Sequence, residues 1–135
     1  MNYWLVKSEP FKFSFDHLIN DKKTMWDGVR NYQARNNMMA MKEGDLVLFY
    51  HSNEGKEVVG LAKVAKEHYP DPTTEDKRWV VVDIVPLEKL KKTVTLEQIK
   101  KDPRLENIAL IKQARLSVMG LKKEEFDIIL ELSEE

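Results

Sequence analysis

Residues 79–85 read Trp-Val-Val-Val-Asp-Ile-Val, and this stretch decides the fold because it is the most strand-like part of the chain. β-Branched and aromatic residues favour strands, so it predicts a central strand. Two further apolar runs, 46–50 (Leu-Val-Leu-Phe-Tyr) and 58–64, lie on either side of Asn53-Glu54-Gly55. This arrangement is typical of two strands joined by a hairpin loop. Gly60, in the second run, leaves room for a close approach on one face of the sheet.

Outside this group, a first strand is predicted over 3–7, and the remaining elements are short helices. Ser14 and Thr95 are both suited to cap helices, and Thr95-Leu96-Glu97-Gln98 fits a capping box. Helices are also predicted over 34–41, 105–112 and 122–132. Strands and helices do not alternate regularly, which excludes a doubly wound sheet. The sequence therefore predicts an α+β fold, a small mixed β-barrel with short helices packed around it.

Composition is that of an ordinary globular domain, and we expect residues 1–135 to form a single one. The 22 Lys and Arg and 23 Asp and Glu residues give a formal charge of −1, which excludes a polycation that coats nucleic acid by charge alone. There is no cysteine, so disulfides and thiolate chemistry are excluded. No segment approaches the roughly 18 apolar residues of a membrane span. We expect a cytoplasmic monomer with no membrane partner.

Motifs for cofactors, metals and common catalytic machinery are absent. The chain has neither of the glycine-rich loops that hold phosphates, because its five glycines are dispersed. His17, His51 and His68 lie far apart and form no metal-binding pattern. We therefore expect no cofactor, no metal site and no enzymatic activity.

Two polar and aromatic clusters in the N-terminal part are candidate binding segments. Lys7-Ser8-Glu9-Pro10 is either a solvated strand end or a set of hydrogen-bonding groups at a barrel mouth. Residues 26–37 combine Trp, Tyr, two Arg, Gln and three Asn. Amide side chains pair with base edges, arginine binds phosphate and aromatic rings stack on bases. The alternative is that Trp26 simply covers the core.

Two further clusters follow later in the chain. Residues 50–53 (Tyr-His-Ser-Asn) form either a polar hairpin end or part of a site. In the segment 112–118, Arg115 and Ser117 face one way if the chain is extended, with Leu116 and Val118 toward the core. Its basic residues either bind phosphate or are solvated.

Together these segments resemble the EVE domain family. The resemblance rests on YWLVKSEP, WDGVRNYQARN, GDLVLFYHSN, VVGLAKV, YPDPT, WVVVDIVPL and RLSV, in family order from Asn2 to Leu132. It implies a PUA-like fold, similar to that of the YTH domain, which reads methylated adenine in an aromatic cage. It also implies a modified-base reader, with methylated or hydroxymethylated cytosine in DNA as the leading ligand and DNA favoured over RNA.

The resemblance and the four clusters together define a predicted site. By analogy with YTH domains, Lys7, Ser8 and Trp26 form its centre, and Trp79 is either a second aromatic wall or a core residue. We expect Trp26→Ala to lower the stability by less than the same change does at a buried tryptophan. The predicted base pocket consists of Lys7, Ser8, Glu9, Trp26, Gly28, Val29, Asn31, Tyr50, His51, Ser52 and Ser117. The predicted phosphate-binding residues, expected on one face, are Arg30, Arg35, Lys112 and Arg115.

Other functions remain open at this point. An enzyme acting on modified nucleotides would use Glu9, His51 and Asp83 as acid and base groups. An RNA-binding module is a further alternative. A protein-interaction module would use the helical face around Phe126.

Overall fold

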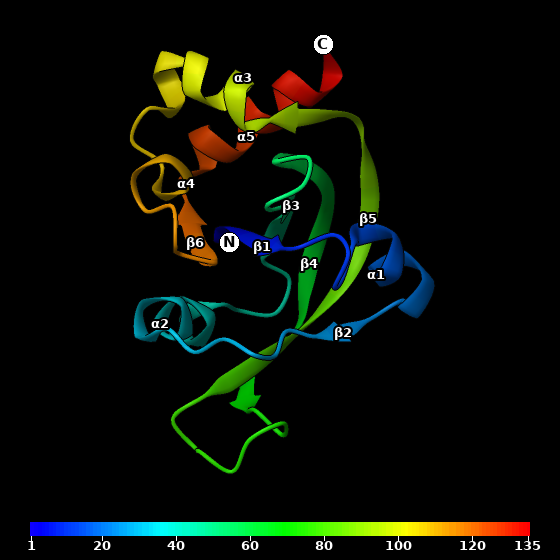
Figure 1. Ribbon diagram of the computed structural model, residues 1–135, viewed down its shortest axis with the longest axis vertical. Coiled ribbons are helices and arrows are strands. Elements are labelled where there is room, and N and C mark those ends of the chain that lie inside the picture. The colour runs from blue at the N-terminus through cyan, green and yellow to red at the C-terminus, as the bar shows by residue number, and fades with distance from the viewer.

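The computed structural model describes residues 1–135 and contains one mixed sheet surrounded by short helices (Figure 1). The strands are β1 (Tyr3–Ser8), β2 (Thr24–Met25), β3 (Leu46–His51), β4 (Glu57–Pro70), β5 (Val80–Thr95) and β6 (Val118–Leu121). The helices are α1 (Phe15–Asp21), α2 (Tyr32–Ala40), α3 (Leu96–Lys101), α4 (Ala109–Lys112) and α5 (Lys123–Glu134), with a 3₁₀ turn at Pro103–Leu105. None of these helices is long and apolar enough to cross a membrane.

The sheet has the strand order β2-β5-β4-β3-β1-β6, in which β1 and β3 are parallel and the other pairs antiparallel. The predicted α+β class is confirmed, but the expected barrel is not closed, because β2 and β6 do not pair. Helix α2 lies between these two edges instead and packs against both β5 and β6 (Figure 1). The Asn37 side-chain nitrogen donates to the Val118 carbonyl at 2.8 Å, which ties α2 to β6. The sheet therefore has an open seam.

The predicted strands are confirmed, although two of them are longer than the sequence indicated. The predicted central position of the strand at 79–85 is wrong, because β5 lies beside the two-residue edge strand β2. β4 continues to Pro70, beyond the predicted end at 64, and β5 begins at Val80 and continues to Thr95. Residues 86–95 lack a strong β pattern, and pairing with β4 keeps them extended. The pairing of β4 with β5 has several register shifts, which allow these long strands to bend.

Helix caps explain where most helices begin. The Ser14 and Thr95 hydroxyls accept backbone N–H groups of His17 and Gln98, so both predicted caps are confirmed. Helix α2 starts at Tyr32 because the Asn31 side-chain oxygen accepts the Ala34 N–H at 2.9 Å. The single helix predicted over 105–112 is wrong: a 3₁₀ turn and the four-residue α4 replace it.

Gly60 provides the close approach that the sequence predicted. The Phe15 ring packs on its Cα, and a Cβ built there would lie 2.4 Å from Phe15 Cζ. Phe15 is almost fully buried and has little room to move. We expect Gly60→Ala to lower the free energy of unfolding by about 1–3 kcal/mol, through overpacking. Urea denaturation measures this, and Gly120→Ala is the control, because a Cβ there meets only ordinary contacts with Trp4. Equal effects of the two changes would contradict this packing.

Candidate functional site

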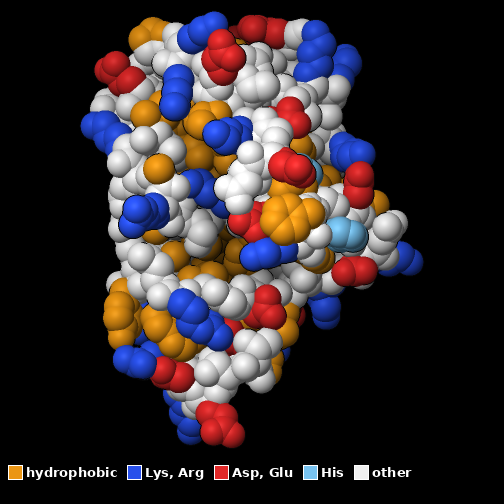
Figure 2. Space-filling model, in the orientation of Figure 1, with side chains coloured by type: hydrophobic (Ala, Val, Ile, Leu, Met, Phe, Trp, Pro, Cys, Tyr) orange, Lys and Arg blue, Asp and Glu red, His pale blue; other side chains and the backbone are white.

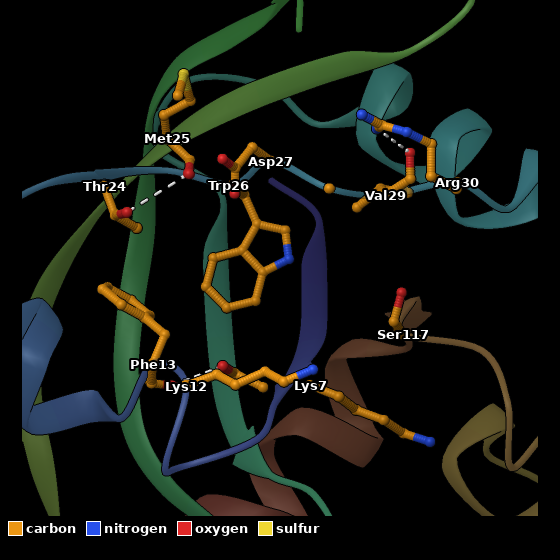
Figure 3. Close-up of a pocket in the computed structure, with 12 residues that line it drawn as sticks. Lys7, Lys12, Phe13, Thr24, Met25, Trp26, Asp27, Val29, Arg30 and Ser117 are labelled. Atoms are coloured by element: carbon orange, nitrogen blue, oxygen red, sulfur yellow. Dashed lines mark hydrogen bonds between the residues drawn. The ribbon is translucent and has the colours of Figure 1, made fainter. Parts of the chain in front are cut away.

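A cavity of about 500 Å³ opens at the seam of the sheet, between the end of β1, the turn after it, β2 with the segment that follows it, and the residue before β6. It is lined by Lys7, Ser8, Lys12, Phe13, Thr24, Met25, Trp26, Asp27, Gly28, Val29, Arg30 and Ser117. Figure 3 shows the Trp26 indole in the middle of this group, with Phe13 and Ser117 on different sides of it. The volume is in the range of about 300–1,000 Å³ that is usual for small-molecule sites.

Trp26 belongs to both the core and the cavity wall. Its backbone N–H donates to the Val82 carbonyl at 2.8 Å, which fixes the chain after β2 to β5. Its indole meets the Phe49 ring edge-on, with the centroids 5.5 Å apart, and the Phe13 ring at 6.3 Å. Only 9% of the residue is exposed. Trp26 is thus itself a buried tryptophan, so the basis for expecting a smaller stability cost than for a buried tryptophan is wrong.

The segment after Trp26 is held in place by a buried carboxylate, Asp71, that the sequence analysis did not single out. Gly28 has φ +75°, a conformation that glycine adopts without strain, and its N–H points to Asp71 at 3.4 Å. The Arg30 guanidinium donates to the same Asp71 oxygen at 3.1 Å. Thr73 donates its N–H and its hydroxyl to the other oxygen, at 2.7 and 2.5 Å.

The only sequence signal for this role is that Asp71 lies between two prolines, Pro70 and Pro72. Burial works to raise the pKa of Asp71, but the hydrogen bonds from Thr73, Arg30 and Gly28 outweigh it and lower the pKa below its ordinary value. Asp71 is therefore a fixed anion that orients one wall of the cavity.

Basic side chains surround the cavity, although the whole chain is slightly acidic. Lys7 donates to the Ala114 carbonyl at 2.8 Å, and burial lowers its pKa. Lys12 pairs with Glu9 at 3.1 Å, and Arg30 lies on the opposite wall with Asp71. Figure 2 shows a hollow with hydrophobic side chains at its base and Lys and Arg side chains around it. This arrangement favours an anionic ligand with an apolar part.

The structure brings together only some of the residues in the predicted site. Besides Trp26, the cavity contains Lys7, Ser8, Gly28, Val29, Arg30 and Ser117. Lys12, Phe13, Thr24, Met25 and Asp27 were missed, although Lys12 and Phe13 directly follow the first cluster. The predicted residues that do not line the cavity are Glu9, Asn31, Arg35, Tyr50, His51, Ser52, Trp79, Lys112 and Arg115.

Local structure explains most of these absences. Asn31 caps α2, and Tyr50 is buried. Tyr50 and Ser52 line a second, smaller cavity of about 210 Å³, which Lys7 separates from the first. In the segment 112–118, Leu116 and Val118 are buried as predicted, but Lys112 ends α4 and Arg115 is exposed.

Trp79 belongs to a separate aromatic group beside α2. Its ring centroid lies 5.2 Å from that of Tyr32, and the Arg30 guanidinium lies 5.7 Å from it. Arg35 stacks over Tyr32 at 4.9 Å. Trp79 is thus connected to the cavity indirectly, through Arg30 and through Asp71, whose N–H donates to the Trp79 carbonyl at 3.0 Å.

The groups proposed for the alternative functions lie elsewhere. His51 accepts the Phe15 N–H at 3.1 Å, and burial lowers its pKa. Asp83 accepts a hydrogen bond from the Tyr69 hydroxyl at 2.5 Å. Burial is the larger cause and this hydrogen bond the next, and together they raise the pKa of Tyr69 to about 12. Glu9 forms an ion pair with Lys12. None of these three groups lines the cavity. Phe126 is 2% exposed and packs on Tyr3, so it offers no free surface to a protein partner.

Comparison with known proteins identifies relatives that share the sequence and the fold. The family model of the EVE domain matches residues 2–132. Mouse thymocyte nuclear protein 1 is 40% identical over 98% of this chain and 74% of its own length. A crystal structure from Agrobacterium tumefaciens superposes with a TM-score of 0.96 at 44% identity, covering 98% of this chain and 93% of that one. The human THYN1 protein, solved in complex with 5-methylcytosine containing DNA, gives 0.94 at 36% identity, covering 100% of this chain and 99% of that one.

Proposed function

Because the chain belongs to the EVE domain family, as its motifs predicted, we propose that it binds DNA carrying a modified cytosine and takes that base into the cavity around Trp26. The observation that carries the proposal is the cavity itself, which places an indole among three cationic side chains, Lys7, Lys12 and Arg30. The complex of the human relative with 5-methylcytosine DNA supports the same ligand class.

The cavity offers each interaction that a flipped base requires. Extruding a base from a duplex costs a few kcal/mol, and stacking of that base on an aromatic ring offsets about 1–3 kcal/mol of this cost. Lys12 and Arg30 lie at opposite walls of the cavity, where they can bind the phosphates on either side of that nucleotide. Ser8, Thr24 and Ser117 provide hydroxyl groups in the wall that can bond a base edge.

Selectivity for the modification is expected to be modest. Burying one methyl group contributes about 0.8 kcal/mol, which is roughly a fourfold preference. A hydroxymethyl group needs a hydrogen-bonding partner. Glu9, His51 and Ser52, polar residues of the base pocket that the sequence predicted, do not line the cavity. We propose that Ser117 or Thr24 provides that partner.

Fluorescence polarisation with matched duplexes tests the proposal. We expect a duplex with one 5-methylcytosine to bind a few-fold more tightly than the unmodified duplex, and an RNA counterpart to bind more weakly. Affinity falls as salt rises, because bound phosphates release counterions. The mass of the oligonucleotide stays unchanged after incubation, because we propose binding without chemistry. Lys12→Ala weakens binding, whereas Lys100→Ala in α3, a residue that does not line the cavity, leaves it unchanged.

Three results would contradict the proposal. Equal affinity for modified and unmodified duplexes would exclude a base reader. Binding that salt does not affect would point to a free base or nucleotide as the ligand. A change in oligonucleotide mass would establish an enzyme.

A further inference from the structure

Phe11 is an aromatic side chain that the fold leaves in solvent, with 66% of the residue exposed. It does not lie on a loose loop. The N–H groups of Lys12 and Phe13 both donate to the Glu9 carbonyl, at 3.0 and 2.9 Å, and the Ser8 hydroxyl donates to the Phe13 carbonyl at 2.6 Å. The turn is thus tied on both sides of Phe11, and its ring is exposed from a fixed backbone.

The turn stands at the edge of the cavity. Lys12 and Phe13, the next two residues, both line the cavity, and Phe13 meets the Trp26 indole edge-on. The Lys12 ammonium lies 6.0 Å from the centroid of the Phe11 ring. An exposed ring is therefore paired with a cation beside the opening that the proposed base would enter.

A flipped base leaves a gap in the stack of the duplex. Proteins that distort DNA insert apolar side chains between base steps, where the ring replaces lost stacking. A ring placed next to a base-sized cavity, with a lysine at its side to hold the adjacent phosphate, has the chemistry for this task. We propose that Phe11 enters the duplex and fills the gap that the extruded base leaves. This inference rests on the proposed function.

Comparing duplex with single-stranded DNA tests the inference, because only a duplex has a stack to fill. Both oligonucleotides carry one 5-methylcytosine in the same sequence. We expect Phe11→Ala to weaken duplex binding about 5- to 150-fold, the range of one base–aromatic stacking contact, and single-strand binding less than twofold. Phe11→Trp keeps a flat ring and is expected to restore duplex binding. Lys12→Ala weakens both, because it removes a phosphate contact.

The fold is expected to tolerate these changes, since Phe11 is exposed, and thermal melting of each variant checks this. Unchanged duplex binding by Phe11→Ala overturns the inference and leaves the proposed function intact. Equal losses on duplex and single strand also overturn it, because Phe11 is then an ordinary contact residue. A native protein that binds the modified single strand but no duplex overturns it as well. Equal affinity of the native protein for modified and unmodified DNA instead overturns the proposed function.

Discussion

Trp26→Ala is expected to lower the free energy of unfolding by about 3–5 kcal/mol, the usual range for removing a buried tryptophan. The indole, Phe13 and Phe49 form three mutually contacting rings, so removing the indole leaves both phenyl rings beside a void. Urea denaturation followed by circular dichroism measures the loss. A loss below about 1 kcal/mol would show that the indole contributes little to the core.

The same change is expected to weaken binding of the modified duplex, and a matched variant separates this from the loss of stability. Stacking on an aromatic residue contributes about 1–3 kcal/mol per base, or about 5- to 150-fold in affinity. Phe15→Ala removes another buried ring, which does not line the cavity, and is expected to cost similar stability with unchanged affinity. Measurements at low temperature keep both variants folded. If both variants bind equally well, the base does not stack on Trp26.

Asp71→Ala is expected to cost about 2–4 kcal/mol of stability, because it leaves the donors of Gly28, Arg30 and Thr73 without their acceptor. The value lies below that of a fully buried ion pair, since the Arg30 side chain is 40% exposed. DNA affinity should fall as well, since the wall from Gly28 to Arg30 is no longer fixed. Asp76→Ala is the matched control, because Asp76 lies in the same loop but pairs with Arg78 outside the cavity. Similar effects of the two changes would show that Asp71 has no special role.

Asp71 also predicts how stability depends on pH. Its pKa is lower in the folded protein than in the unfolded chain, where it is about 3.9. The group therefore stabilises the fold above about pH 4, and its contribution is lost as the pH falls through the folded value. Asp71→Asn should flatten that part of the stability profile relative to the native protein. An unchanged slope below pH 4 would show that other carboxylates account for the acid transition.

The sequence predicted the parts of the fold in which local pattern and tertiary pairing agree. The run at 46–50, the return strand at 58–64 and the stretch at 79–85 all became strands, because β-branched residues are bounded there by turn residues. The extension of β5 through residues 87–95 was not predictable, because this stretch has no regular alternation of polar and apolar residues and is held extended by pairing with β4. The two-residue β2 is too short for any pattern to indicate it.

The candidate site was predictable where residues adjoin a strand end, as at Lys7 and Ser8, or follow a turn, as at Trp26. From the sequence alone, we could not tell whether the Asn31 amide caps a helix or is free to bind a base, because the neighbouring residues are compatible with both roles. In the structure it caps α2. Nor could the sequence identify Asp71, which acts on Gly28 across more than forty positions of the chain. Such contacts depend on the bend of β4 and β5, which no local pattern specifies.

The brevity of β2 has a consequence for self-association. It pairs only with Asp83 and Ile84, so most of the 16-residue β5 has no neighbouring strand on that side. A long bare edge is a template onto which a second copy can add a strand. The unpaired stretch beyond Ile84 includes Pro86, which has no N–H to offer. The exposed lysines that follow are held by helices, since Lys89 pairs with Asp16 of α1 at 2.8 Å and Lys91 with Glu134 of α5 at 4.0 Å. A second copy that added a strand here would meet a proline and these ion-paired side chains, which disfavours edge-to-edge assembly of the longest strand of the protein.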